Sequence, residues 1–120
     1  MSRKVRAGLG SEITGGNARI VTLSPTPRGL PRTAIVVRDA GGILRGYLNL
    51  CKHILIPLDG GSGSVFDPTK TMLQCGTHGA TYRLDDGYCT AGPCEGESLD
   101  PLELVHDSDG TVYVIDVETV

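Results

Sequence analysis

The stretch TAIVVRDAGGILRGYLNL, residues 33–50, contains two apolar segments joined by the sequence DAGG. Both segments are rich in β-branched and aliphatic residues, which favour strands. Asp and Gly suit the turn of a β-hairpin because they accept the backbone angles that tight turns require. The stretch therefore predicts two strands, over residues 33–39 and 43–50, joined by a hairpin turn.

The same pattern continues on both sides of this hairpin. Because 17 Gly and 7 Pro divide the 120 residues into short pieces, hardly any window shows the 3.6-residue apolar period of a helix. The sequences DDG at 85–87 and DSDG at 107–110 predict further turns. Five more strands are expected at residues 18–23, 71–75, 80–84, 102–105 and 111–117. We therefore predict an all-β fold, an antiparallel β-sandwich or barrel.

The length and composition indicate one folded domain over residues 1–120. A hydrophobic fraction of 39% and a charged fraction of 21% are typical of a globular protein and argue against general disorder. The first 15 residues contain no predicted strand, and we expect them to be disordered, as chain termini often are.

Charge and hydropathy exclude several kinds of partner. A net charge of −3 argues against a nucleic-acid partner. No apolar run approaches the roughly 20 residues that a membrane span needs, and no secretory signal is recognisable, so we expect a cytoplasmic protein with no membrane partner. In a reducing cytoplasm, four cysteines indicate metal ligands or redox chemistry more than a disulfide framework.

Residues 51–96 differ from their flanks because they hold all four cysteines and two of the three histidines. Cys51 and His53 are two residues apart, so an extended backbone would direct both to one side. Cys75 and His78 are three residues apart, and a turn would bring them together in the same way. The two pairs would supply two thiolates and two imidazoles, which suit zinc or an iron-sulfur centre and not calcium or magnesium.

The order of these donors narrows the choice of metal site. A usual Cys2His2 zinc finger takes two cysteines and then two histidines, whereas each loop here offers one of each. A binuclear iron-sulfur cluster, with two Cys on one iron and two His on the other, fits this order. The alternatives are a mononuclear zinc site, unrelated thiols and imidazoles, or a centre of four cysteines at positions 51, 75, 89 and 94.

The sequence at this point resembles the Rieske-type 2Fe-2S ferredoxin family. Its signature, C-x-H followed by C-x-x-H, is matched by CKH at 51–53 and CGTH at 75–78, and the likeness extends from about residue 33 to 117. The resemblance implies a Rieske fold with a two-loop cluster-binding subdomain and one 2Fe-2S cluster per chain. Cys51 and Cys75 would bind one iron, and His53 and His78 the other. Gly92 and Pro93 would belong to a third loop that covers the cluster.

The resemblance also suggests how the cluster is tuned. High-potential members carry a serine two residues after the second histidine and a tyrosine four residues after it, and both donate to sulfur; the corresponding residues here are Ala80 and Tyr82. Losing one donor to sulfur lowers the potential, so we expect a value toward the lower part of the Rieske range, raised somewhat by Tyr82 unless that residue only packs. Cys89 and Cys94 would either form a disulfide that braces the third loop or remain two reduced thiols.

A cluster with four protein ligands has no open coordination position, which favours electron transfer over substrate binding. Rieske oxygenases use a second iron bound by two histidines and a carboxylate, but only His106 remains here, and we expect it at the edge of the core. We therefore expect no catalytic residue, and a one-electron ferredoxin between a flavin-dependent NAD(P)H reductase and a terminal oxygenase. The alternatives are a small electron-transfer subunit of a reductase such as a nitrite reductase, a zinc-stabilised interaction module, and a thiol redox sensor using Cys89 and Cys94.

Overall fold

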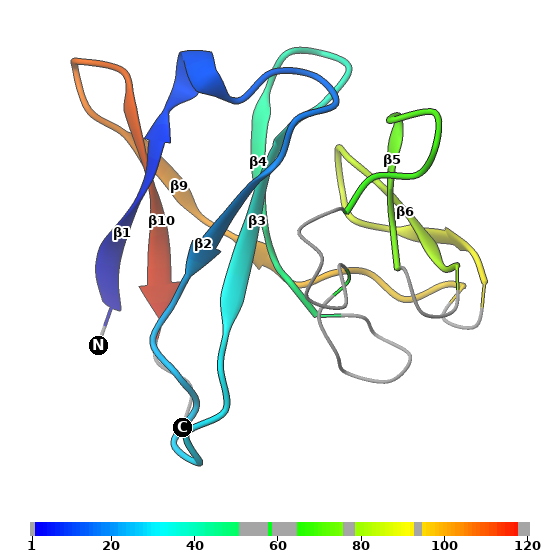
Figure 1. Ribbon diagram of the computed structural model, residues 1–120, viewed down its shortest axis with the longest axis horizontal. Coiled ribbons are helices and arrows are strands. Elements are labelled where there is room, and N and C mark those ends of the chain that lie inside the picture. Colours follow the sequence, from blue (N-terminus) through cyan, green and yellow to red (C-terminus); the bar gives the residue numbers. More distant parts are fainter. Residues whose placement is uncertain (1, 51–57, 59–64, 76–78, 93–94, 118–120) are drawn as a thin grey trace.

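The protein is described from a computed structural model, which covers residues 2–50, 58, 65–75, 79–92 and 95–117. This part of the chain contains ten strands and one short 3₁₀ helix (Figure 1). In chain order they are β1 (Ser2–Leu9), η1 (Gly10–Glu12), β2 (Arg19–Thr22), β3 (Thr33–Arg38), β4 (Leu44–Leu48), β5 (Met72–Gln74), β6 (Thr81–Arg83), β7 (Cys89–Ala91), β8 (Pro101–Leu102), β9 (Leu104–His106) and β10 (Thr111–Val117). The predicted all-β fold is confirmed, and within the described residues no helix is long and apolar enough to cross a membrane.

The strands form three antiparallel sheets. Their orders are β1-β10-β9, β2-β3-β4-β8 and β5-β6-β7. The first two sheets make up the scaffold of the molecule. The third belongs to a small subdomain, defined here as the described residues between 65 and 100, which lies beside β3 and β4 (Figure 1).

The predicted hairpin over residues 33–50 is present as β3 and β4, and its turn is built by Asp39. One carboxylate oxygen of Asp39 accepts hydrogen bonds from the backbone N–H groups of Gly41 (2.9 Å) and Ile43 (3.0 Å). The other accepts a bond from Arg45 Nε at 3.0 Å. The Ile43 amide and then Arg45 hold the pKa of the Asp39 carboxyl below its usual value. The Asp39 side chain thus supplies hydrogen-bond acceptors for the backbone N–H groups of its own turn.

Strand β3 is buried on both faces. Ala34 and Val36 lie in a cluster between the two scaffold sheets, whereas Ile35 and Val37 lie in a second cluster against the subdomain. We call these the scaffold core and the subdomain core. A strand covered on both faces needs apolar residues at consecutive positions, which explains the uninterrupted run AIVV. The strand therefore joins the two halves of the molecule.

A buried ion pair closes the scaffold. Asp116 on β10 is 1% exposed, and its carboxylate accepts bonds from the Ser24 N–H (2.8 Å) and from Arg32 Nη1 (2.9 Å). Burial by itself raises the pKa of Asp116, but these hydrogen bonds outweigh it and lower that pKa below its usual value. The loop between β2 and β3 is thereby fixed to the last strand.

All seven predicted strands are confirmed, although the structure divides and adds some. The segment expected at 102–105 is split between β8, which pairs with β4, and β9, which pairs with β10. The sequence predicted no strand in residues 1–15, but β1 pairs with β10 from Ser2 to Leu9. Because β1 contains several cationic residues, it lacks the apolar run by which the other strands were predicted. Such charges are common on edge strands because they discourage pairing with other chains.

Candidate functional site

Cys75 begins a tight turn directly after β5. It is fully buried, its backbone N–H donates to the Ala80 carbonyl (2.8 Å), and the Gly79 N–H donates back to the Cys75 carbonyl (2.9 Å). Gly79 has a φ of 73°, a left-handed conformation that suits glycine. The β5–β6 connection therefore places a thiol at the end of the subdomain core on a backbone closed by its own hydrogen bonds.

Of the four predicted ligands, Cys75 lies within the described residues. Cys51, His53 and His78 lie outside them, as do Pro93 and Cys94. Among the described residues no three His, Cys, Asp or Glu side chains come together as a metal site. The predicted donor set, two thiolates and two imidazoles, fits an iron-sulfur centre by its chemistry, and the position of Cys75 at the end of a buried turn is compatible with it.

Gly92 packs directly against the Cys75 turn. A Cβ atom on Gly92 would lie 2.7 Å from Ala80 Cα, a distance that no side chain tolerates, and the φ of Gly92 is +99°. Glycine is therefore required both for the backbone conformation and for the close approach. The structure thus brings together two predicted site residues from different connections, Ala80 and Gly92.

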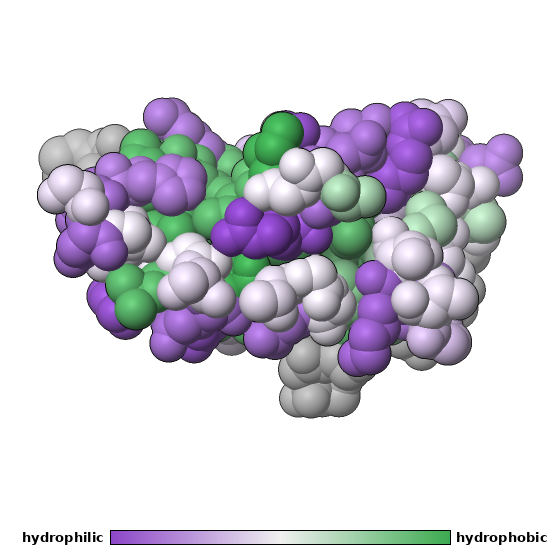
Figure 2. Space-filling model, turned by 90° about the horizontal axis from the view of Figure 1, so that it is seen from above, coloured by the Kyte–Doolittle hydropathy of each residue, from purple (hydrophilic) through white to green (hydrophobic). Residues whose placement is uncertain are grey.

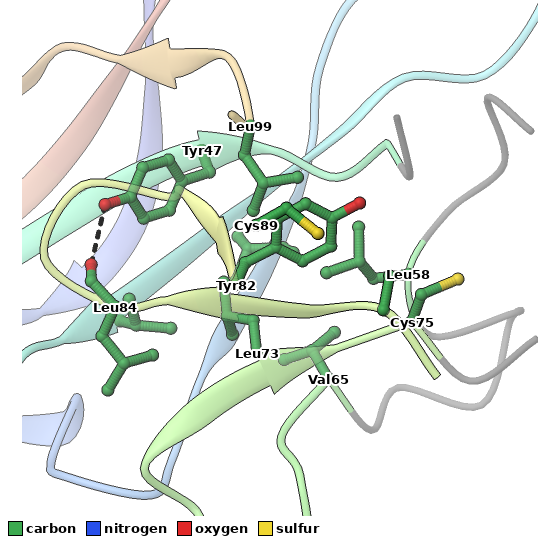
Figure 3. Close-up of a cluster of buried hydrophobic side chains, with 12 residues drawn as sticks. Tyr47, Leu58, Val65, Leu73, Cys75, Tyr82, Leu84, Cys89 and Leu99 are labelled. Atoms are coloured by element: carbon green, nitrogen blue, oxygen red, sulfur yellow. Dashed lines mark hydrogen bonds between the residues drawn. The ribbon is translucent and has the colours of Figure 1, made fainter. Parts of the chain in front are cut away.

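Tyr82 and Cys89 face each other across the β6–β7 pair and are both fully buried. In the subdomain core, the Tyr82 hydroxyl points toward the end where Leu58 and Cys75 lie (Figure 3). Cys89 Sγ lies 3.2 Å from the Ala91 carbonyl oxygen. The proposed disulfide to Cys94 stays a prediction, and so does donation from Tyr82 to a cluster sulfur.

Tyr47, which the sequence did not single out, ties the subdomain to the scaffold. From β4 its hydroxyl donates to the Leu84 carbonyl at 2.7 Å (Figure 3). Burial raises the pKa of this phenol to about 12. A Cβ atom on Gly87 would come within 2.9 Å of the Tyr47 ring, so the β6–β7 turn lies close over it. The available signal was a tyrosine within an apolar strand, since a buried phenol needs a hydrogen-bond partner.

The structure corrects the predicted place of His106. We expected a histidine at the edge of the core, but its side chain is exposed at the end of β9. The alternation with Leu102 and Leu104 was misleading because those two leucines belong to strands of different sheets.

The subdomain surface is acidic. Its described residues include six carboxylates and two cationic side chains, namely Asp67, Asp85, Asp86, Glu95, Glu97 and Asp100 against Lys70 and Arg83. The large hydrophobic side chains exposed in the described chain are Leu9, Leu30, Ile43 and Tyr88, of which Tyr88 belongs to the subdomain. Seen from above, hydrophobic surface gathers mainly over the scaffold and is broken by hydrophilic residues (Figure 2). Charge therefore dominates the described subdomain surface.

Comparisons with known proteins agree with this architecture. A family model described as the Rieske [2Fe-2S] domain matches residues 5–106. The oxygenase subunit of carnitine monooxygenase from Acinetobacter pittii (strain PHEA-2) is 27% identical over 113 residues, which cover 88% of this chain and 28% of that protein. The chain thus spans little more than a quarter of the length of this relative.

Solved structures give the same picture. An oxygenase chain in the reduced complex between oxygenase and ferredoxin in carbazole 1,9a-dioxygenase has 25% identity and a TM-score of 0.65, covering 94% of this chain and 27% of that one. The terminal oxygenase of carbazole 1,9a-dioxygenase from Novosphingobium sp. KA1 has 22% identity and a TM-score of 0.66, over 99% of this chain and 30% of its own. The terminal oxygenase of carbazole 1,9a-dioxygenase from Nocardioides aromaticivorans IC177 has 21% identity and a TM-score of 0.67, covering 98% of this chain and 31% of that one. The last two likenesses concern the fold alone.

Proposed function

Because the chain belongs to the Rieske [2Fe-2S] domain family, we propose that it is a one-electron carrier that passes electrons from a flavin-dependent NAD(P)H reductase to a terminal oxygenase. The observation that carries this proposal is the family match over residues 5–106, which spans the whole ligand signature. A [2Fe-2S] cluster, when bound, accepts and releases one electron at a time.

The residues of this chain would hold the cluster and shield one side of it. In this proposal Cys51 and Cys75 bind one iron, and His53 and His78 bind the other. The burial of Cys75, Ala80 and Tyr82 supports a dry, rigid wall behind the second ligand loop. Such a wall limits solvent reorganisation when charge changes, and it leaves the histidine side for exchange with a partner.

Spectroscopy and metal analysis test the ligand assignment. Anaerobically purified protein should contain iron and acid-labile sulfide, and its reduced form should give the EPR signal of mixed Cys and His ligation. Cys75→Ser should abolish or severely deplete the cluster, whereas Cys89→Ser, also at a buried position, should keep it. A colourless protein with zinc would instead support the interaction module, and loss of the cluster in Cys89→Ser would support an all-cysteine centre.

The partner is tested by electron transfer. The acidic subdomain favours a partner with a basic docking surface, so the association rate should fall as salt is raised. With NAD(P)H and a flavin reductase, the chain should be reduced and then reoxidised by a separately purified terminal oxygenase in stopped flow. Transfer to a nitrite reductase, with co-elution from gel filtration, would favour the reductase-subunit alternative.

A second candidate is the electron-entry domain of a longer oxygenase. It is favoured by the relatives, which are oxygenase subunits and terminal oxygenases of which this chain matches 27–31%. For this candidate, transfer to a separate oxygenase would be slow and would not saturate, whereas fusion of the chain to an oxygenase catalytic domain would restore turnover.

A further inference from the structure

Asn49 makes a buried set of hydrogen bonds just before the first ligand pair. It follows β4, and its backbone N–H donates to the Thr33 carbonyl at 2.8 Å. Its side-chain Nδ2 donates to Thr33 Oγ1 at 3.0 Å, and its Oδ1 accepts from the Leu58 N–H at 2.8 Å. With 4% of its surface exposed, Asn49 uses both ends of its amide within the protein.

Leu58 connects this amide to the candidate site. Its side chain is fully buried and belongs to the subdomain core with Cys75 and Tyr82. In the close-up it lies at the end of this core where the Tyr82 hydroxyl and Cys75 are found (Figure 3). The Leu58 backbone is thus held by the scaffold while its side chain packs beside the second ligand loop.

We propose that Asn49 is a positioning residue for the cluster. By holding the Leu58 N–H, it fixes where the chain rejoins the subdomain core after the first ligand pair, and so sets the spacing between that pair and Cys75. The described residues on either side of Cys51 and His53 are both held near the end of β4: the Leu50 N–H donates to the Leu48 carbonyl at 2.9 Å, and the Leu58 N–H donates to Asn49 Oδ1 at 2.8 Å. The inference rests on the proposed function, since Cys51 and His53 are ligands in that proposal.

Three variants separate positioning from general stability. Asn49→Ala removes both side-chain bonds and leaves the buried Leu58 N–H without its acceptor. Asn49→Asp keeps an acceptor for Leu58, and the Thr33 hydroxyl can turn to donate to it. Thr33→Val is the matched control, because it removes the other partner of Asn49 and leaves the Leu58 bond in place.

In the cluster-loaded protein, amide hydrogen exchange at Leu58, the EPR line shape and the midpoint potential are measured together. Asn49→Ala should speed exchange at Leu58 by about 10- to 100-fold, the range expected for losing a buried hydrogen bond, and should alter both the line shape and the potential. Asn49→Asp should give wild-type values for all three readouts. Thr33→Val should keep the exchange rate at Leu58 within about 3-fold of the wild-type rate, with an unchanged line shape and potential.

Unchanged exchange at Leu58 in Asn49→Ala would overturn the proposal, and so would faster exchange with a wild-type line shape and potential. If Asn49→Ala does not fold, Asn49→Ser replaces it, because its side chain is too short to reach Leu58. Failure of both to fold would assign Asn49 to stability alone and also overturn the proposal. Absence of iron from the wild-type protein would refute the proposed function, whereas the exchange comparison would still report on the Leu58 bond.

Discussion

The scaffold core and the subdomain core lie against opposite faces of β3, yet their compositions differ. The buried members of the scaffold core are all aliphatic: Ala7, Ile13, Val21, Leu23, Ala34, Val36, Val112 and Val114. The subdomain core includes Tyr47, Tyr82, Cys75 and Cys89 among its aliphatic residues. One face of the strand therefore supports packing alone, whereas the other also holds the hydroxyl and thiol groups near the candidate site. The following experiments test whether this division is functional.

The largest effect on stability is expected in the scaffold, at Asp116. Asp116→Ala would leave the Arg32 guanidinium and the Ser24 N–H without their shared acceptor, at a cost of about 3–5 kcal/mol in the free energy of unfolding. Denaturant unfolding measures this loss, and Arg3→Ala, which removes a more exposed contact 3.6 Å from the same carboxylate, is the control. The EPR signal of the folded fraction should not change. A changed signal would show that the scaffold core also affects the candidate site.

The same residue predicts a response to acid. The pKa of Asp116 is lower in the folded protein than in the unfolded chain, where its usual value is 3.8. The stability it contributes is therefore present above that pH and is lost as the pH falls through the lowered folded pKa. Asp116→Asn should have a shallower acid unfolding curve than the wild type. Parallel curves would show that other carboxylates govern acid unfolding.

Val36→Ala and Val37→Ala apply one chemical change to the two faces of β3. Both valines are fully buried, so each substitution should cost about 2–3 kcal/mol. Native-state hydrogen exchange should rise mainly in β1 and β10 for Val36→Ala, and mainly in β5–β7 for Val37→Ala. Equal increases throughout both regions would show that the two cores open as one unit.

Gly92→Ala tests the close approach within the subdomain. Gly96→Ala is its matched control, because Gly96 has a similar φ of +93° with nothing within 4 Å of the added Cβ, whereas at Gly92 the Cβ would meet Ala80. Both variants should lose about 1 kcal/mol through backbone conformation. Gly92→Ala should lose about 1–3 kcal/mol more and shift the midpoint potential. Equal behaviour of the two variants would remove Gly92 from the site.

Tyr47→Phe should have a smaller effect, about 1–2 kcal/mol, because it deletes one hydrogen bond and leaves the Leu84 carbonyl without that donor. The pKa of Tyr47 is raised from 10.0 to about 12 in the folded protein. Its contribution is thus present below pH 10 and is lost as the pH rises toward 12. Between pH 10 and about 12 the free energy of unfolding should fall less with pH in Tyr47→Phe than in the wild type. An unchanged pH dependence would show that the Tyr47 hydroxyl does not contribute to alkaline unfolding.

Ala80→Ser should raise the midpoint potential, because a hydroxyl beside the cluster would add a donor to sulfur. Ala80→Gly is the control without a donor. Redox titration measures both variants. An equal potential in the serine variant would show that no sulfur lies within reach of position 80.

Local sequence rules predicted most of the strands and turns. Asp/Gly turns and β-branched runs identified the hairpins at 39–42, 85–87 and 107–110, each of which the structure contains. These signals are local because the turn residues satisfy their own backbone. Strand β1 was missed because its burial depends on β10, more than 100 residues away in the chain.

The candidate site was predicted by motif spacing and resemblance, but its supporting contacts were not. Nothing in the sequence around Tyr47 names Leu84, 37 residues away, as its acceptor. The need for glycine at position 92 likewise depends on Ala80, which lies 12 residues earlier, just beyond the paired ends of β6 and β7. Such contacts arise from tertiary packing, so no local pattern records them.

The double burial of β3 has a consequence for how its register is specified. In a strand with one solvent-exposed face, a register slip of one residue moves the apolar side chains from the core into solvent, which makes the slipped register unfavourable. Here a slip would only exchange Ala34 and Val36 with Ile35 and Val37, so water offers little discrimination. Side-chain size and the Asp39 turn must provide it instead. A small-to-large change at Ala34 would therefore test whether this strand is aligned by steric fit and not by polarity.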